Sequence, residues 1–142
     1  MSYTTGLVFV DTNILVYARD RSDGPKNQLA RRYLEELWAE RRGRISAQVL
    51  NEYYFVVTHK LSRPLSPDDA QRDVQMYFAW NPIPMATSII QSAWLLERSC
   101  QLNWWDALIL AAAQACGASA LLSKDFSASQ IYAGVKVINP FR

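Results

Sequence analysis

Predicted strands and helices alternate along most of this chain, and this order restricts its fold more than any other feature. The first apolar run, residues 6–10 (GLVFV), shows no polar alternation, which is typical of a strand buried on both faces. Further short strands are predicted at residues 44–46, 118–122 and 135–138. Because strands that alternate with helices form a parallel sheet covered on both faces, the sequence predicts an α/β/α sandwich with a central parallel sheet.

Helical periodicity and helix-start signals place the helices between these strands. In residues 25–42 an apolar stripe lies opposite a face of paired acids and bases, and Gly43 is expected to end that helix. Ser66, followed by proline and two acids, is a strong start signal, and Ser88 with Gln91 has the spacing of a capping box. We therefore expect helices at residues 25–42, 47–60, 66–80, 88–100 and 104–116, with a brief strand near residues 81–84.

Length and composition predict one globular domain, residues 1–142. The segment at 104–116 is apolar on every face but too short to cross a bilayer, so we expect it at the centre of the protein. The N-terminal residues lack the pattern of a signal peptide, and Cys100 with Cys116 are too few for a disulfide framework. These features predict a cytoplasmic protein with two buried, reduced thiols and no membrane contact.

Four acids occupy places where chemistry is expected in such a fold. Asp11 ends the first strand and Asp125 closely follows the strand at 118–122, at the sheet edge where ligands of open parallel sheets bind. Asp106 lies in the first turn of the apolar helix, and Glu52 lies within another helix. Unpaired carboxylates that cluster raise one another's pKa values, and oxygen ligands suit Mg²⁺ or Mn²⁺.

Each acid also has an ordinary structural interpretation. Asp11 is as well suited to cap the helix that follows it, and Asp106 to interact with a helix dipole. Glu52 is typical of a solvated helix face, and Asp125 of a turn. Taken one at a time, the four positions leave both interpretations open.

The sequence segments around the four acids resemble those of a known family. DTNILVYA, QVLNEYYFVVT, WWDALILAAA, LLSKDF and the terminal VKVINPF resemble, in order, the successive motifs of PIN-domain proteins, and above all the toxin ribonucleases of bacterial toxin–antitoxin pairs. The resemblance implies a PIN-like α/β/α fold and a metal pocket formed by Asp11, Glu52, Asp106 and Asp125. It also implies that Thr12, Asn13 and Ser123 hydrogen-bond these carboxylates or metal-bound water.

One position departs from the family pattern. Many relatives carry another acid directly before the last aspartate, where this chain has Lys124. The lysine lowers the negative charge of the expected pocket and weakens the case for a second metal ion. It is either a phosphate contact or simply an exposed turn residue.

Other routes to RNA cleavage lack the residues that they need. His59 is the sole histidine, and no phosphate-binding GxxxxGK[ST] loop, GxSxG motif or catalytic Cys/His pair is present. The remaining route is water activated by Mg²⁺ or Mn²⁺, which hydrolyses the phosphodiester to a 5′-phosphate and a 3′-hydroxyl.

Contacts with a polyanion must come from local patches, since the net charge is only +2. Arg41, Arg42 and Arg44 are candidate RNA contacts together with Lys124. Arginines near the C-terminal end of a helix also interact favourably with the helix dipole. A second basic group, Arg19, Arg21 and Lys26, is partly cancelled by neighbouring acids. Trp38 and Trp94 fit apolar helix stripes, whereas Trp104 and Trp105 border the expected pocket and are candidate stacking platforms.

The resemblance implies two kinds of partner besides the RNA substrate, which is a tRNA, an rRNA or an mRNA. One is a cognate antitoxin that blocks the pocket, and the other is a second copy of the chain in a homodimer. Two rival functions remain: a catalytically silent PIN-like module that binds RNA or protein, and a phosphoryl-transfer enzyme with Asp11 as nucleophile. The second rival is weakened by Asn13, because such phosphatases need an acid at that position.

Overall fold

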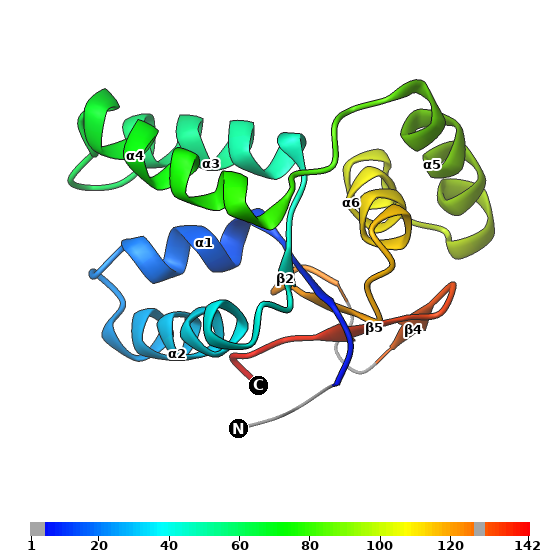
Figure 1. The fold of residues 1–142 in the computed structure, drawn as a ribbon, viewed down its shortest axis with the longest axis horizontal. Helices are drawn as coiled ribbons and strands as arrows, with labels where there is room; N and C mark the ends of the chain where they lie inside the picture. The colour runs from blue at the N-terminus through cyan, green and yellow to red at the C-terminus, as the bar shows by residue number, and fades with distance from the viewer. Residues whose placement is uncertain (1–4, 127–129) are drawn as a thin grey trace.

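The computed structural model describes residues 5–126 and 130–142, which form a five-stranded sheet with helices packed on both of its faces (Figure 1). This is the predicted α/β/α architecture. In chain order the elements are β1 (Val8–Val10), α1 (Thr12–Arg19), α2 (Gly24–Glu40), β2 (Gly43–Arg44), α3 (Ala47–His59), α4 (Pro67–Tyr77), the 3-10 helix η1 (Phe78–Trp80), α5 (Thr87–Cys100), α6 (Trp104–Ala115), β3 (Ala120–Leu122), β4 (Ile131–Tyr132) and β5 (Val135–Ile138).

The sheet has the strand order β2-β1-β3-β5-β4. β1 pairs in parallel with both β2 and β3, and β3 pairs in parallel with β5. The three residues of β1 are completely buried, as expected for a strand covered on both faces. Because β1, β2 and β3 run in the same direction, the residues that follow them share one edge of the sheet.

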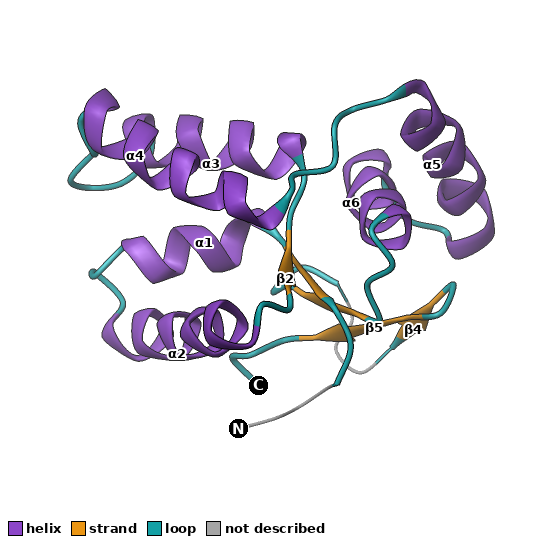
Figure 2. Ribbon diagram, viewed as in Figure 1, coloured by secondary structure: helices purple, strands orange, loops and turns teal. Residues whose placement is uncertain are grey.

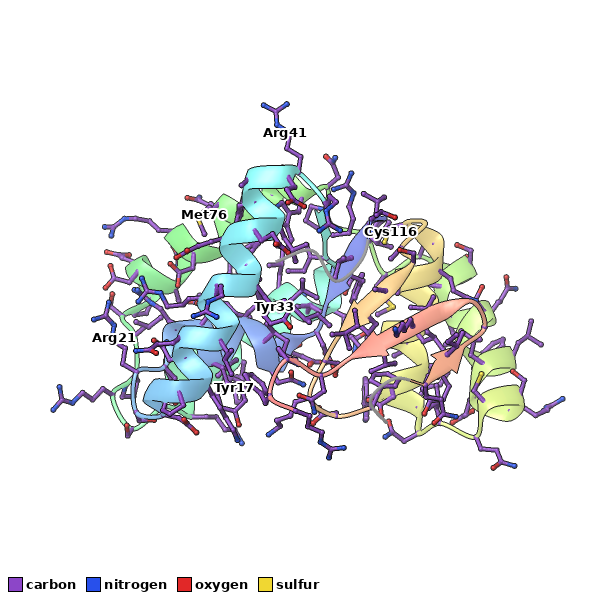
Figure 3. All side chains as sticks on the ribbon, turned by 90° about the horizontal axis from the view of Figure 1, so that it is seen from below. Tyr17, Arg21, Tyr33, Arg41, Met76 and Cys116 are labelled. Carbon is purple, nitrogen blue, oxygen red and sulfur yellow. The ribbon has the colours of Figure 1, made fainter. Side chains whose placement is uncertain are left out.

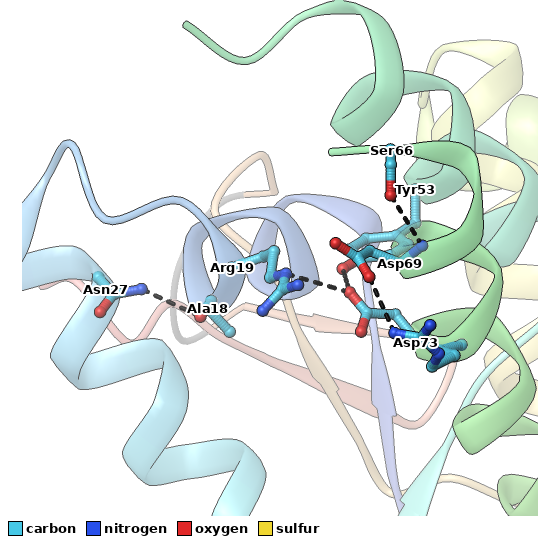
Figure 4. Close-up of polar contacts among 8 residues, drawn as sticks. Ala18, Arg19, Asn27, Tyr53, Ser66, Asp69 and Asp73 are labelled. Carbon is cyan, nitrogen blue, oxygen red and sulfur yellow. Dashed lines mark hydrogen bonds and ion pairs between the residues drawn. The ribbon is translucent and has the colours of Figure 1, made fainter. Parts of the chain in front are cut away.

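Two groups of helices cover the sheet (Figure 2). α6 packs on β3 and β5, with α5 on its outer side, whereas α1 packs between α2 and α3 on the other side. α6 is buried from Ala107 to Ala113, which confirms the predicted central helix. Asn27, a buried polar residue of α2, donates a 2.8 Å hydrogen bond to the Tyr17 carbonyl oxygen at the end of α1. It also donates a 3.0 Å hydrogen bond to the Ala18 carbonyl oxygen (Figure 4). None of the described helices is long and apolar enough to cross a membrane.

Two predicted helix ends are wrong. Gly43 does not close α2: the helix ends at Glu40, and Arg41 takes the left-handed conformation with φ 56°. Gly43 instead lies in β2, where its missing side chain makes room for the ring of Trp80. Ser88 does not cap α5, which begins at Thr87 after Ala86 and has no side-chain cap.

Smaller departures affect the sheet and the tryptophans. The prediction of residues 135–138 matches β5, whereas the other three predicted strands are one to two residues longer than the observed ones. β4, an antiparallel edge strand, was not predicted. The expected strand near 81–84 is a single parallel bridge between Ser46 and Ile83. Trp94 is 57% exposed, so its assignment to a buried stripe is wrong, because α5 buries Ile89, Ala93 and Leu96 instead. Cys100 and Cys116 are free thiols but only half-buried.

Candidate functional site

The four acids singled out from the sequence line one pocket at the carboxyl edge of the sheet. Asp11 follows β1, Glu52 comes from α3, Asp106 from the first turn of α6, and Asp125 from the segment after β3. The pocket has a volume of about 470 Å³, and we call it the carboxylate pocket. Four elements that are distant in sequence therefore converge on one hollow.

Asp11 is the least exposed of the four pocket acids and is also the N-cap of α1. Its Oδ1 accepts a 2.7 Å hydrogen bond from the Thr12 amide, and its Oδ2 accepts a 2.7 Å bond from the Ser123 hydroxyl. The side chain is nearly inaccessible, with 5% exposure. Burial, reinforced by the charges of Asp125 and Glu52, raises the pKa of Asp11 to about 7 in spite of these two hydrogen bonds. Asp11 is therefore both a helix cap and an acid of the pocket, as the two interpretations of the sequence proposed.

Asp106 is held in place by the residue that caps its own helix. Asn103 accepts a hydrogen bond from the Asp106 amide at 2.9 Å and donates from Nδ2 to the Asp106 carboxylate at 3.0 Å. Partial burial, and then the charges of Asp125 and Glu52, raise the pKa of Asp106. The four acids therefore interact electrostatically in the folded protein.

Polar neighbours orient the two more exposed acids. The Thr12 hydroxyl donates to Glu52 at 3.0 Å, and Gln48 donates to the other oxygen of Glu52 at 3.1 Å. Asn13 donates to Asp125 at 3.0 Å. Thr12, Asn13 and Ser123 each donate a hydrogen bond to one of the pocket acids, and Gln48 is an additional neighbour that the sequence did not single out.

Two lysines also line the carboxylate pocket. Lys124 donates from Nζ to the Tyr17 hydroxyl at 3.1 Å and lies 5.2 Å from the centre of the Tyr17 ring. Lys60, just past the end of α3, was not singled out from the sequence. No sequence pattern marks Lys60, because only the folded position of α3 brings it to the pocket.

The donor set of the pocket suits a hard divalent cation. The charged groups of the pocket that can ligate a metal are carboxylates. Oδ1 of both Asp106 and Asp125 has no hydrogen bond within the described residues. In the same residues, however, no three acidic, histidine or cysteine side chains already converge on one point as metal ligands. The chemistry of the residues fits the ion, and closer approach of the acids requires rotation of their side chains.

The arginines at 41–44 do not border this pocket. Arg42 precedes β2 and lies beside the start of β1, where it donates to the Gly6 carbonyl at 2.9 Å and pairs with Glu40 at 2.7 Å. Arg44 donates to the Gly43 carbonyl at 2.7 Å. Figure 3 shows Arg41 at the end of the molecule away from Tyr17 and Arg21. Arg42 is thus engaged within the protein, and the cluster lies at the amino edge of the sheet, opposite the carboxylate pocket.

A different basic surface adjoins the pocket. Three arginines, Arg19, Arg21 and Arg63, line a hollow of about 470 Å³ that shares Asp20 and Leu61 with the carboxylate pocket. We call it the arginine hollow. Arg19 is tied to Asp73 at 3.3 Å, and Asp73 also accepts a 2.5 Å bond from Tyr53 (Figure 4). Arg63 was missed in the sequence because the loop after α3 carries no recognisable motif.

Comparison with family models decides the assignment. A model described as the PIN domain matches residues 8–134. The chain belongs to the PIN-domain family. The matched region contains all four acids of the carboxylate pocket, and the family has the α/β/α fold seen here. A comparison of this PIN domain with curated protein sequences gives no match.

Solved structures with the same fold include members of toxin–antitoxin pairs. A toxin–antitoxin complex from Klebsiella pneumoniae is 23% identical, with a TM-score of 0.66 and coverage of 94% of this chain and 97% of that one. VapBC2 from Rickettsia felis, bound to a DNA fragment from its promoter, is 18% identical, with a TM-score of 0.60 and coverage of 92% and 96%. The sarcin–ricin-loop-cleaving toxin VapC20 from Mycobacterium tuberculosis is 18% identical, with a TM-score of 0.58 and coverage of 80% and 86%.

Proposed function

We propose that this PIN domain is a divalent-metal-dependent endoribonuclease and the toxin of a toxin–antitoxin pair. The observation that carries the proposal is the carboxylate pocket, in which Asp11, Glu52, Asp106 and Asp125 meet from four elements. Their mutual repulsion and the raised pKa values of Asp11 and Asp106 are relieved by a bound cation. Helix capping accounts for Asp11 alone, whereas a bound cation accounts for the convergence of all four acids.

The four acids would hold Mg²⁺ or Mn²⁺, and Thr12, Asn13 and Ser123 would fix their orientation through the hydrogen bonds described above. When bound, the ion lowers the pKa of a water molecule and neutralises charge on the phosphate. In the reaction, a water oxygen bonds to phosphorus, and the bond between phosphorus and the 3′-oxygen breaks. The leaving oxygen takes up a proton, so the products are a 5′-phosphate and a 3′-hydroxyl.

The RNA backbone would cross the carboxylate pocket and continue into the arginine hollow. Lys60 and Lys124 lie at the pocket, and the exposed side chains of Arg21 and Arg63 lie beyond it. Positive charge next to the acids compensates the repulsion between carboxylates and phosphates, and arginine binds phosphate through its planar fork. This path replaces the arginines at 41–44 as the RNA-binding surface.

The family and its solved members support the toxin assignment. Structures with this fold include toxin–antitoxin complexes and a toxin that cleaves the sarcin–ricin loop. We propose that residues 1–142 act as a single cytoplasmic PIN domain, blocked by a cognate antitoxin. Phe55, Met76 and Phe78, on α3, α4 and η1, are exposed large apolar side chains, and they support a homodimer.

Cleavage of a mixed tRNA and rRNA pool by purified protein tests the nuclease proposal. We expect cleavage with Mn²⁺ or Mg²⁺, none in EDTA, and a loss of at least about 100-fold in the Asp106→Asn variant, since a pocket ligand contributes no less than its orienting neighbours. The control is Asp68→Asn, which removes an exposed acid of α4 outside the pocket. Well-folded wild type that binds RNA without cleaving it would support a silent binding module. Cleavage unaffected by EDTA would refute the metal-dependent mechanism.

A further inference from the structure

Three hollows follow one another along α3. The arginine hollow lies past its C-terminal end, and the carboxylate pocket extends from Lys60 back to Gln48. A third hollow lies at the first turns of the helix. Gln48 and Lys60 are separated by about 18 Å along the axis, at 1.5 Å per residue. A chain that lies along α3 therefore meets the arginines, the acids and the third hollow in that order.

The third hollow carries an exposed aromatic surface. It has a volume of about 630 Å³ and is lined by Ala47, Gln48, Asn51, Glu52, Met85 and Trp105. We call it the tryptophan hollow. Trp105 is 64% exposed and Met85 is 44% exposed, although both are large apolar side chains. An exposed apolar surface beside a polar pocket is a common sign of a binding site.

The backbone of Trp105 belongs to the same capped helical turn as an acid of the carboxylate pocket. Trp105 directly precedes Asp106 in the first turn of α6, and Asn103 caps that turn through the Asp106 amide. Three residues, Gln48, Glu52 and Trp105, line both hollows. A group in the tryptophan hollow is therefore an immediate neighbour of a group in the carboxylate pocket.

Amide groups give this hollow polar edges as well as an apolar wall. Asn51 donates from Nδ2 to the Ala47 carbonyl at 3.0 Å, which leaves its Oδ1 to accept other bonds. Gln48 donates to Glu52, and its Oε1 is inaccessible and has no partner in the part of the chain that the structure describes. An unsatisfied buried oxygen is unfavourable, so a ligand that reorients Gln48 and donates to it gains free energy.

We infer that the tryptophan hollow binds an unpaired nucleobase of the RNA, next to the phosphate that lies in the carboxylate pocket. This inference rests on the proposed nuclease function and adds the conformation of the substrate to it. The flat base stacks on Trp105 and Met85, and its polar edge faces Gln48 and Asn51. A base within a duplex already stacks on its neighbours, so the site selects single-stranded segments or loops.

Two binding measurements in EDTA test the subsite without any cleavage. The probes are a fluorescein-labelled unstructured oligoribonucleotide and the same strand annealed to its complement. The binding of each probe is measured by fluorescence anisotropy at low salt. We expect the single strand to bind more tightly, and Trp105→Ala to weaken its binding by roughly 5- to 150-fold, the range for loss of one base–aromatic stack. Trp105→Phe keeps an aromatic face and should retain most of the affinity.

The matched control is Trp94→Ala, which removes a tryptophan that is 57% exposed on α5 and lines none of the three hollows. It should leave RNA binding unchanged, and thermal melting should show that all variants fold. Equal binding by wild type and Trp105→Ala would overturn the subsite and leave Trp105 to a protein partner. A wild type that prefers the duplex, or binds neither probe, would also overturn it.

The two proposals fail in different ways. If wild type cleaves RNA with metal while Trp105→Ala shows the same KM, the nuclease function stands and the nucleobase subsite is overturned. If wild type binds the single strand in a Trp105-dependent manner but cleaves nothing, the subsite stands as a binding site and the nuclease function fails.

Discussion

At the scale of single residues, Asp11 combines two roles that place opposite demands on its charge. Helix capping and the Ser123 hydrogen bond favour the carboxylate, whereas burial and the neighbouring acids favour the protonated form. The outcome is a pKa of about 7 in the protein without metal. The charge of Asp11 therefore affects the stability of the fold as well as the chemistry of the pocket.

This pKa predicts how stability changes with pH in EDTA. Between pH 3.8 and about 7 the folded protein keeps a proton on Asp11 that the unfolded chain has released, so the free energy of unfolding falls as pH rises through this window. The total change is at most about 4 kcal/mol. The Asp11→Asn variant lacks this contribution, and asparagine also caps helices well.

Urea unfolding of wild type and Asp11→Asn from pH 4 to pH 8 measures the effect. The variant should gain stability relative to wild type as pH rises, and the difference should become constant above about pH 7. A difference between the two proteins that does not vary with pH would contradict the raised pKa. With Mn²⁺ present, wild type should gain more stability than the variant, because the variant has one carboxylate fewer to bind the ion.

The residue scale also shows what a sequence can reveal. The four acids were selected because their positions after strands and in helix turns matched family motifs, and they do line one pocket. Lys60, Arg63 and Gln48 were missed because a lysine after a helix, an arginine in a loop and a glutamine in a helix are ordinary locally. The positions of Lys60 and Arg63 near the acids follow only from the path of the chain around α3, whereas the contact between Gln48 and Glu52 follows from their spacing of four residues on a helix.

At the scale of elements, β2 and η1 depend on each other through Gly43. A Cβ atom at this position would lie 2.4 Å from ring atoms of Trp80, which is 3% exposed and packs against Trp38 and Tyr77. A ring enclosed in this way has little room to move. The glycine that the sequence marked as a helix end is in fact required by packing.

We therefore predict that Gly43→Ala destabilises the protein by about 1–3 kcal/mol, the usual range for overpacking a core. Gly24→Ala is the matched control, because nothing lies within 4 Å of a Cβ at the start of α2. Its free energy of unfolding should be unchanged or slightly higher. Chemical denaturation of both variants provides the test, and equal stabilities would show that Trp80 moves aside freely.

Element types were more predictable than element ends. The strands and the long helices follow from hydrophobic periodicity, which reports burial directly. The end of α2 and the start of α5 were wrong because Arg41 and Ala86 occupy positions for which other residue types are preferred. At these two helix ends, contacts with other parts of the fold outweigh the local preference for particular residue types. The strand β4 was missed because its two residues give no periodicity to read.

At the scale of the whole molecule, the faces on which the charged residues lie matter more than the net charge. The arginine hollow adjoins the carboxylate pocket, whereas the arginines at 41–44 lie at the amino edge of the sheet. In the sequence the 41–44 group is the denser one, and only the topology shows that it faces away from the acids. A net charge of +2 says nothing about this separation.

Salt dependence of RNA binding distinguishes the two faces. Replacing Arg21 and Arg63 together by glutamine should flatten the slope of log affinity against log salt by about 1.4, at roughly 0.7 per phosphate contact for single strands. The matched control replaces Arg31 and Arg41, which are exposed and line none of the three hollows. An equal loss of slope in both double variants would mean that binding is spread over the surface and does not follow the proposed path.

The pairing of β1 with β3 also fixes when the carboxylate pocket can be completed during protein synthesis. The Asp11–Ser123 hydrogen bond joins positions 112 residues apart, and β1 lacks one of its two neighbours until β3 has been made. At about 5–20 residues per second, a ribosome needs between roughly 6 and 22 s to pass from one position to the other. A nascent chain during that interval has three of the four pocket acids at most. The proposed nuclease therefore lacks a complete carboxylate pocket while this part of its chain is still being translated.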